Sequence, residues 1–172
     1  MSIARKYRKL LRSPTRFFYD FFAKRVATES VPEVTRAVRQ QLSNGVDYSV
    51  IAAVYGVEPY IGAFLKSIVE QTIGFEQRIE LILVDDGSPD GSVEIIEAWQ
   101  RRYPNNIRLV RKENGGAASA RNAGLEVARG EWVTFIDPDD TISLNYFEQV
   151  YDFLARTESE VSAVTCRVVF FD

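Results

Sequence analysis

Two clusters of aspartates are the residues of this sequence best suited to chemistry. Asp85 and Asp86 end the apolar run "IELILVDD", and Asp137, Asp139 and Asp140 end the run "WVTFIDPDD". Neighbouring carboxylates repel one another, and no basic residue lies close in sequence to the second cluster. A hard divalent cation such as Mg²⁺ or Mn²⁺ takes oxygen ligands from one or two carboxylates and from substrate phosphates. The second cluster therefore predicts a metal site, and helix capping by the same aspartates is the alternative.

Other common catalytic groups are missing from the sequence of 172 residues. It contains no histidine and a single cysteine, Cys166. This composition excludes Ser-His-Asp and Cys-His catalysis, histidine-ligated zinc, an internal disulfide and a cysteine-built metal site. Binding and catalysis must then rest on carboxylates, backbone amides, arginine or lysine side chains, or a hard metal ion.

The elements that position the aspartates alternate between strands and helices. Apolar, β-branched runs predict buried strands at 48–55, 79–86, 107–112, 132–137 and 161–171. Apolar residues at helical spacing predict helices at 58–72, 92–103, 118–129 and 144–156. Such alternation predicts an α/β fold with a mostly parallel sheet covered by helices on both faces. Ligands of such folds bind beyond the carboxyl ends of the strands, where both aspartate clusters fall.

A glycine-rich stretch, "NGGAASARNAG", follows the third predicted strand and opens a helix at residues 114–124. It matches neither the dinucleotide-binding pattern GxGxxG nor the P-loop pattern GxxxxGK[ST]. A Rossmann dehydrogenase and a P-loop NTPase are therefore disfavoured. A nucleotidyltransferase stays open on the predicted fold, although no glycine-rich loop with a lysine or arginine follows the first strand to hold a triphosphate.

A basic segment precedes an acidic domain. Residues 1–25 hold eight basic side chains against one acidic, whereas the remaining residues have a net charge of −10. Four phenylalanines recur at helical spacing in this basic segment, at positions 17, 18, 21 and 22. A basic helix with an aromatic face suits an anionic membrane surface, and packing on its own domain or on a partner helix is the alternative. Because the rest of the chain is acidic, we expect no binding to nucleic acid.

The sequence predicts two parts and a cytoplasmic location. Residues 1–46 form a helical segment with a linker, and residues 47–172 form the domain. No apolar run approaches the roughly 20 residues that a membrane span needs, and the start lacks the apolar core of a signal peptide. We therefore expect a cytoplasmic protein, peripheral on the cytoplasmic face of the membrane if the aromatic face docks there.

Three stretches resemble, in order and spacing, the nucleotide-sugar-binding half of family 2 glycosyltransferases. They are "YSVIAAVYGVEPYIGAFLKSIVEQT", "IELILVDDGSPDGSVEII" and "NGGAASARNAGLEVARGEWVTFIDPDD". The resemblance covers Asp47 to Asp172 and implies the Rossmann-like GT-A fold. It also implies transfer of a sugar, with inversion, from a nucleotide-diphosphate donor to a glycan or lipid-linked acceptor. A UDP-sugar is the favoured donor because family members most often use uridine.

The resemblance implies a nucleoside site at the first two strand ends. Ala53, Tyr55 and Glu58 match the first strand-to-helix loop, which wraps the nucleoside in the family. Asp86 matches the acid that binds the base, and a plain turn residue in "DDGSPDG" is the alternative. The family usually has proline at the position of Ala53 and asparagine at that of Gly56. These departures leave the donor specificity open, but not the fold.

The resemblance also assigns roles in the glycine-rich stretch. Gly115 and Gly116 match a loop that lets the backbone come close to the nucleotide, with ordinary turn geometry as the alternative. Arg121 matches a basic residue near the base or the phosphates, and pairing with a surface acid is its alternative.

The second aspartate cluster matches the family's DxD motif. Asp137 and Asp139 are the two acids of the motif, with Asp139 and Asp140 nearest the ribose and the metal. We expect Asp139, followed by Asp140, to bind Mn²⁺ or Mg²⁺. Three carboxylates do not discriminate between these two ions. The metal would neutralise charge on the leaving diphosphate.

The family's general base lies well after the DxD segment, in the acceptor-binding half. The chain ends at Asp172, so we expect a donor-binding piece of a longer enzyme, inactive by itself. A catalytically silent nucleotide-binding module and a membrane-docking module are the alternatives. The segment "KLLRSPTRFFYDFFAKR" also resembles leader segments of glycosyltransferases for bacterial capsule and other surface polysaccharides.

Overall fold

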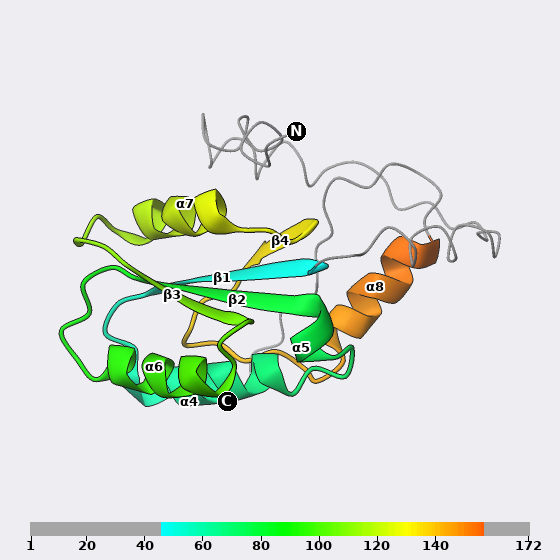
Figure 1. The fold of residues 1–172 in the computed structure, drawn as a ribbon, viewed down its shortest axis with the longest axis horizontal. Helices are drawn as coiled ribbons and strands as arrows, with labels where there is room; N and C mark the ends of the chain where they lie inside the picture. Colours follow the sequence, from blue (N-terminus) through cyan, green and yellow to red (C-terminus); the bar gives the residue numbers. More distant parts are fainter. Residues whose placement is uncertain (1–45, 157–172) are drawn as a thin grey trace.

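The computed structural model describes residues 46–156, which form a four-stranded parallel sheet flanked by helices (Figure 1). The strand order is β3-β2-β1-β4. The strands are β1 (Tyr48–Val54), β2 (Ile79–Asp85), β3 (Ile107–Arg111) and β4 (Trp132–Phe135). The helices are α4 (Glu58–Val69), α5 (Phe75–Arg78), α6 (Ser92–Arg102), α7 (Ala117–Val127) and α8 (Tyr146–Arg156). All strand pairs are parallel, as the alternation of strands and helices predicts.

Helices cover both faces of the sheet, as expected. In Figure 1 helices α4 and α6 lie below the sheet and α7 lies above it. Alternate residues of a strand point to opposite faces, so Val50, Ala52 and Val54 belong to the larger core with α4 and α6. Ile51 points the other way and packs with Ile82, Val84 and the α7 residue Ala120. The two central strands are therefore buried on both sides.

Close packing of α7 on the sheet depends on Gly124. A Cβ at this position would lie 2.4 Å from Cγ2 of Ile51 and 3.4 Å from Cγ2 of Val84. No real Cβ contact is that short, so any side chain here would push the helix away from β1. Glycine thus fixes the distance between α7 and the sheet, and with it the position of every side chain on α7.

Several features differ from the sequence-based expectations, among them two helix boundaries and the burial of one strand. The helix predicted to reach residue 72 ends at Val69, and the unpredicted four-residue helix α5 follows it. The last helix begins at Tyr146 instead of residue 144. Strand β4 is half-buried along its length, contrary to the expected buried strand, because it lies at the edge of the sheet formed by the described residues.

Several predictions fall outside the described residues. They are the basic helical segment with its aromatic face, almost all of the proposed 1–46 part, and the closing strand at 161–171. Among the helices between residues 46 and 156, none is both long and apolar enough to cross a membrane.

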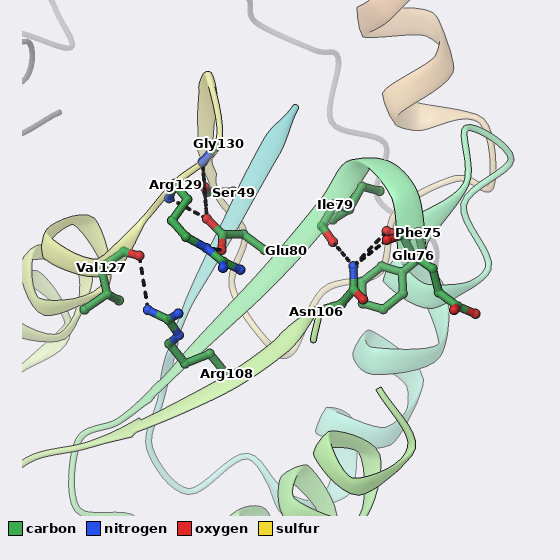
Figure 2. A network of polar contacts seen from close by, with 10 residues as sticks. All are labelled: Ser49, Phe75, Glu76, Ile79, Glu80, Asn106, Arg108, Val127, Arg129 and Gly130. Carbon is green, nitrogen blue, oxygen red and sulfur yellow. Dashed lines mark hydrogen bonds and ion pairs between the residues drawn. The ribbon is translucent and has the colours of Figure 1, made fainter. Parts of the chain in front are cut away.

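A buried carboxylate network holds the amino-terminal edge of the sheet together (Figure 2). Glu80 of β2 accepts hydrogen bonds from Ser49 Oγ at 2.6 Å, from the Arg129 amide at 2.5 Å and from Arg129 Nε at 2.8 Å. The Gly130 amide donates to Ser49 Oγ at 2.7 Å. Burial alone would raise the pKa of Glu80, but these hydrogen bonds outweigh burial and hold the pKa below its usual value. The network fixes the connection from α7 to β4.

Candidate functional site

The loops that follow the four strands gather at one edge of the sheet. In the parallel register Val54 pairs with Asp85, Asp85 pairs with Arg111, and Ile51 pairs with Phe135. The connections after β1, β2 and β3 lie together at the left of Figure 1. Both aspartate clusters and the glycine-rich stretch begin at this carboxyl edge, which is where α/β folds bind ligands.

Asp86 connects the end of β2 to the glycine-rich stretch at this edge. Its Oδ1 accepts hydrogen bonds from Lys112 Nζ at 2.5 Å and from the Gly115 amide at 3.0 Å. Its Oδ2 accepts one from the Gly116 amide at 2.7 Å. The hydrogen bond from Lys112, followed by those from the two amides, holds the pKa of Asp86 below its usual value. Asp86 is therefore a charged acceptor that ties the glycine-rich stretch to the end of β2.

Backbone conformation at Gly116 and close side chains at Gly115 both favour glycine in this stretch. Gly116 has a φ of +83°, which side-chain-bearing residues rarely adopt, and it precedes α7 without any side-chain cap. A Cβ on Gly115 would lie 2.9 Å from Lys112 Nζ and 3.0 Å from Ser119 Oγ. The amides of Gly115 and Gly116 bind Asp86, and the first amides of α7 beyond them have no side-chain cap.

Neighbouring Asp85 has a structural contact instead. Its Oδ1 accepts a hydrogen bond from the Ser88 amide at 2.8 Å, which closes the turn after β2. The Ser88 hydroxyl is buried and, among the described residues, has no hydrogen-bond partner. A buried orphan hydroxyl in this loop is a polar group that a ligand or an ordered water can satisfy.

Arg121 of α7 reaches Asp137, the first acid of the second cluster. The Nη2 to Oδ1 distance is 2.5 Å, and both side chains are partly exposed. No basic residue lies close to this cluster in sequence, but α7 brings in a cation from 16 residues away. Arg121 offsets the charge of Asp137.

Asp139 and Asp140 differ from Asp137. Both are exposed, and neither carboxylate makes a hydrogen bond or ion pair within the part of the chain that the structure describes. Both lie in a turn in which the Asp140 amide donates to the Asp137 carbonyl at 3.0 Å. Pro138, between Asp137 and Asp139, is buried. The turn thus leaves two unpaired carboxylates at the site.

Glu58 ties two loops together. It is the first residue of α4, and its Oε2 accepts a hydrogen bond from the Gly91 amide at 2.8 Å. In return, Asp90 Oδ2 accepts one from the Glu58 amide at 2.9 Å. Hydrogen bonds from the side chain of Ser92, and then from the Glu58 amide, lower the pKa of Asp90. The predicted nucleoside ligand Glu58 thus has a structural contact of its own, to the loop before α6.

Two tyrosines are exposed near the first loop. Tyr55 directly follows β1 and is 55% exposed, and Tyr60 in the first turn of α4 is 54% exposed. Ala53, expected on the loop, lies within β1 and packs in the smaller core on the α7 side. Sequence reasoning missed Tyr60 and Lys112. Lys112 had one recognisable signal, since it directly follows a strand end and precedes the glycines by three residues.

The described geometry agrees with a sequence-family assignment. A family model described as glycosyl transferase family 2 matches residues 49–172. The chain belongs to glycosyl transferase family 2. The minor teichoic acid biosynthesis protein GgaB of Bacillus subtilis (strain 168) is 46% identical to it over 124 residues. This match covers 72% of the chain but only 14% of GgaB, so the chain spans a small part of that relative.

Solved structures confirm the GT-A fold. S. aureus TarS 1–349 in complex with UDP-GlcNAc has a TM-score of 0.59 and 32% identity, covering 63% of this chain and 31% of TarS 1–349. The mannosyltransferase PcManGT from Pyrobaculum calidifontis, in complex with GDP-Man and Mn²⁺, has a TM-score of 0.55 and covers 90% of this chain and 41% of its own. At 24% sequence identity, PcManGT is similar to this chain in fold alone.

The acids of this family 2 chain suit a metal ion that is bound partly by protein carboxylates and partly by a substrate. No group of three or more acidic, histidine or cysteine side chains is arranged to hold a metal ion between residues 46 and 156. An all-protein metal cage is therefore not formed by these residues. Asp139 and Asp140 nevertheless fit Mg²⁺ or Mn²⁺, which commonly binds one or two carboxylates and completes its shell with phosphates and water.

Proposed function

We propose that this chain is the donor-binding part of a metal-dependent, inverting glycosyltransferase. Its substrate would be a nucleotide-diphosphate sugar bound along the carboxyl edge of the sheet. The observation that carries the proposal is the pair of unpaired carboxylates, Asp139 and Asp140, on the edge where Asp86 binds the glycine-rich loop. Membership of glycosyl transferase family 2 supports the same reaction class.

The base would lie between Tyr55 and Asp86, with Ala53 and Glu58 shaping the surrounding loops. An exposed tyrosine ring offers a stacking surface, and a charged carboxylate accepts a hydrogen bond from a base N–H. Uracil has such an N–H, and the UDP-GlcNAc bound to TarS favours a UDP-sugar as donor.

The diphosphate would lie against the amides that open α7, near Arg121. Backbone amides at the start of a helix carry partial positive charge and point toward an anion. When bound, Mn²⁺ or Mg²⁺ supplies Lewis-acid neutralisation of the charge that develops on the leaving diphosphate. Asp139 and Asp140 would hold it. Asp137 would keep Arg121 beside them through the 2.5 Å ion pair.

The acceptor would be a cell-surface polysaccharide or its lipid-linked precursor. The support is the 46% identity to a protein of minor teichoic acid biosynthesis. The general base would come from a part of the enzyme outside this chain. Residues 1–25 would dock on the cytoplasmic face of a membrane or on a partner helix, where a lipid-linked acceptor is accessible.

Calorimetric titration of UDP into the 172-residue chain, with and without Mn²⁺, tests the donor site. We expect binding that Mn²⁺ strengthens, and Asp139→Asn should weaken metal-dependent binding about tenfold or more, which corresponds to about 1.4 kcal/mol. Asp152→Asn is the matched control, because Asp152 is a partly exposed aspartate on α8. Equal metal-dependent binding by wild type and Asp139→Asn, or no UDP binding at all, would contradict the proposal.

A further inference from the structure

A polar pocket lies at the opposite edge of the sheet from the proposed donor site. It has a volume of about 220 Å³ and is open to solvent on one side. Its polar lining comes from the end of α6 and the turn after it, through Gln100 and Asn105, and from Arg108 and Arg129. Neither the sequence motifs nor the proposed donor site uses any of these side chains.

The two arginines approach the pocket from different elements (Figure 2). Arg108 is the second residue of β3 and faces the α7 side of the sheet, where its Nη1 donates to the Val127 carbonyl at 3.4 Å. Arg129 follows α7 and uses Nε to bind Glu80. Its side chain is 53% exposed, which leaves its terminal amino groups accessible.

The charges around this pocket do not balance. Glu80 carries one negative charge, and its oxygens already accept from Ser49, Arg129 and the Gly130 amide. Arg108 forms no ion pair with an acid of residues 46–156, and a carbonyl supplies only partial charge. Segment 100–108, "QRRYPNNIR", contains three arginines and no acid, in a domain that is otherwise acidic. One guanidinium charge at the pocket is therefore left without a counter-charge.

We propose that this pocket binds a phosphate group, as a monoester or a diester, between Arg108 and Arg129. The planar guanidinium presents paired N–H donors that match the oxygens of a phosphate. Gln100 and Asn105 also line the pocket, and their side-chain amides can add neutral donors. The hydrogen bond from Arg129 to Glu80 orients its guanidinium before any ligand arrives.

The phosphate in this pocket is not that of the sugar donor. Strand β2 runs from Ile79 at this edge to Asp85 at the carboxyl edge, seven residues that span about 20 Å. A donor diphosphate at the carboxyl edge cannot reach across that distance. The ligand is thus either a separate phosphate compound or a distant unit of a long phosphate-containing chain.

Titration of inorganic phosphate and of a glycerol phosphate oligomer into the 172-residue chain at low salt tests the site. We expect both probes to bind, and Arg108→Gln should weaken their binding about tenfold. Arg108→Lys should bind more tightly than Arg108→Gln but less tightly than wild type, because lysine keeps the charge but not the paired donors. Arg156→Gln is the control, because Arg156 is an exposed arginine on α8. Circular dichroism should show the same thermal unfolding midpoint for wild type and the Arg108 variants.

The outcomes separate the two sources and the two sites. Tighter binding of the oligomer than of inorganic phosphate would support a chain of phosphodiesters, and equal binding a separate phosphate compound. UDP binding should be the same in wild type and Arg108→Gln. The phosphate titration therefore tests this pocket, and the UDP titration tests the proposed donor site, independently of each other. Absence of phosphate binding, or equal loss in Arg156→Gln and Arg108→Gln, would overturn the proposal.

Discussion

Among the neighbours of Asp86, Lys112 lowers its pKa most. Its ammonium lies 2.5 Å from Oδ1, and the same group donates to the Glu113 carbonyl. A hydrogen bond from a cation to a carboxylate is about twice as strong as a neutral one. Lys112 therefore keeps Asp86 deprotonated and keeps the loop of Gly115 and Gly116 in one conformation.

Replacing Lys112 by methionine should weaken UDP binding, provided that the proposed donor site is correct. The loop would lose the contact from Lys112 to Asp86 that orders it, so the dissociation constant should rise about tenfold. The pKa of Asp86 should also rise, so UDP binding of the variant should decline at a higher pH than that of wild type. Calorimetry across the acidic range measures both effects, and Lys66→Met is the control, because Lys66 is an exposed lysine on α4. Superimposable pH profiles would show that Lys112 does not act through Asp86.

At the scale of elements, periodicity predicted the strands and the longer helices because their apolar faces repeat over several residues. The four residues of α5 are too few to show a helical period. The exposed edge of β4 could not be predicted either, since exposure depends on the order of strands in the sheet. The Arg121–Asp137 and Lys112–Asp86 pairs join residues 16 and 26 positions apart. Only the packing of α7 and the register of β2 and β3 bring them together.

Gly124 gives a test of how closely α7 must pack on the sheet. Gly124→Ala should destabilise the domain by about 1–3 kcal/mol, because the new methyl would overlap Ile51 and outweigh the better helix propensity of alanine. Gly62→Ala in α4 is the matched control, since its Cβ would meet nothing within 4 Å. That variant should gain about 0.5–1 kcal/mol. Urea unfolding of both variants measures the difference, and equal stabilisation would contradict the close packing.

At the scale of the whole molecule, Glu80 joins parts of the chain that are far apart in sequence. Its carboxylate holds β1 through Ser49, 31 residues away, and the α7–β4 connection through Arg129, 49 residues away. The opposite edge carries the exposed acids and loops of the proposed donor site. The buried charge of Glu80 is thus satisfied within the protein, whereas Asp139 and Asp140 are exposed and unpaired among the described residues.

This division predicts how the domain responds to acid. The pKa of folded Glu80 is below its usual value, so the stability that its charge contributes is complete above about pH 4.5 and is lost as the pH falls through the lowered pKa. Glu80→Gln should cost about 2 kcal/mol at neutral pH, because hydrogen bonds to a charged group become neutral ones. That difference should shrink as the pH falls below about 4.5, because only the wild type loses a charge there. Urea unfolding at several pH values measures it, with the exposed Glu76→Gln as control. A difference that stays constant with pH would mean that packing, and not the charge of Glu80, holds this edge together.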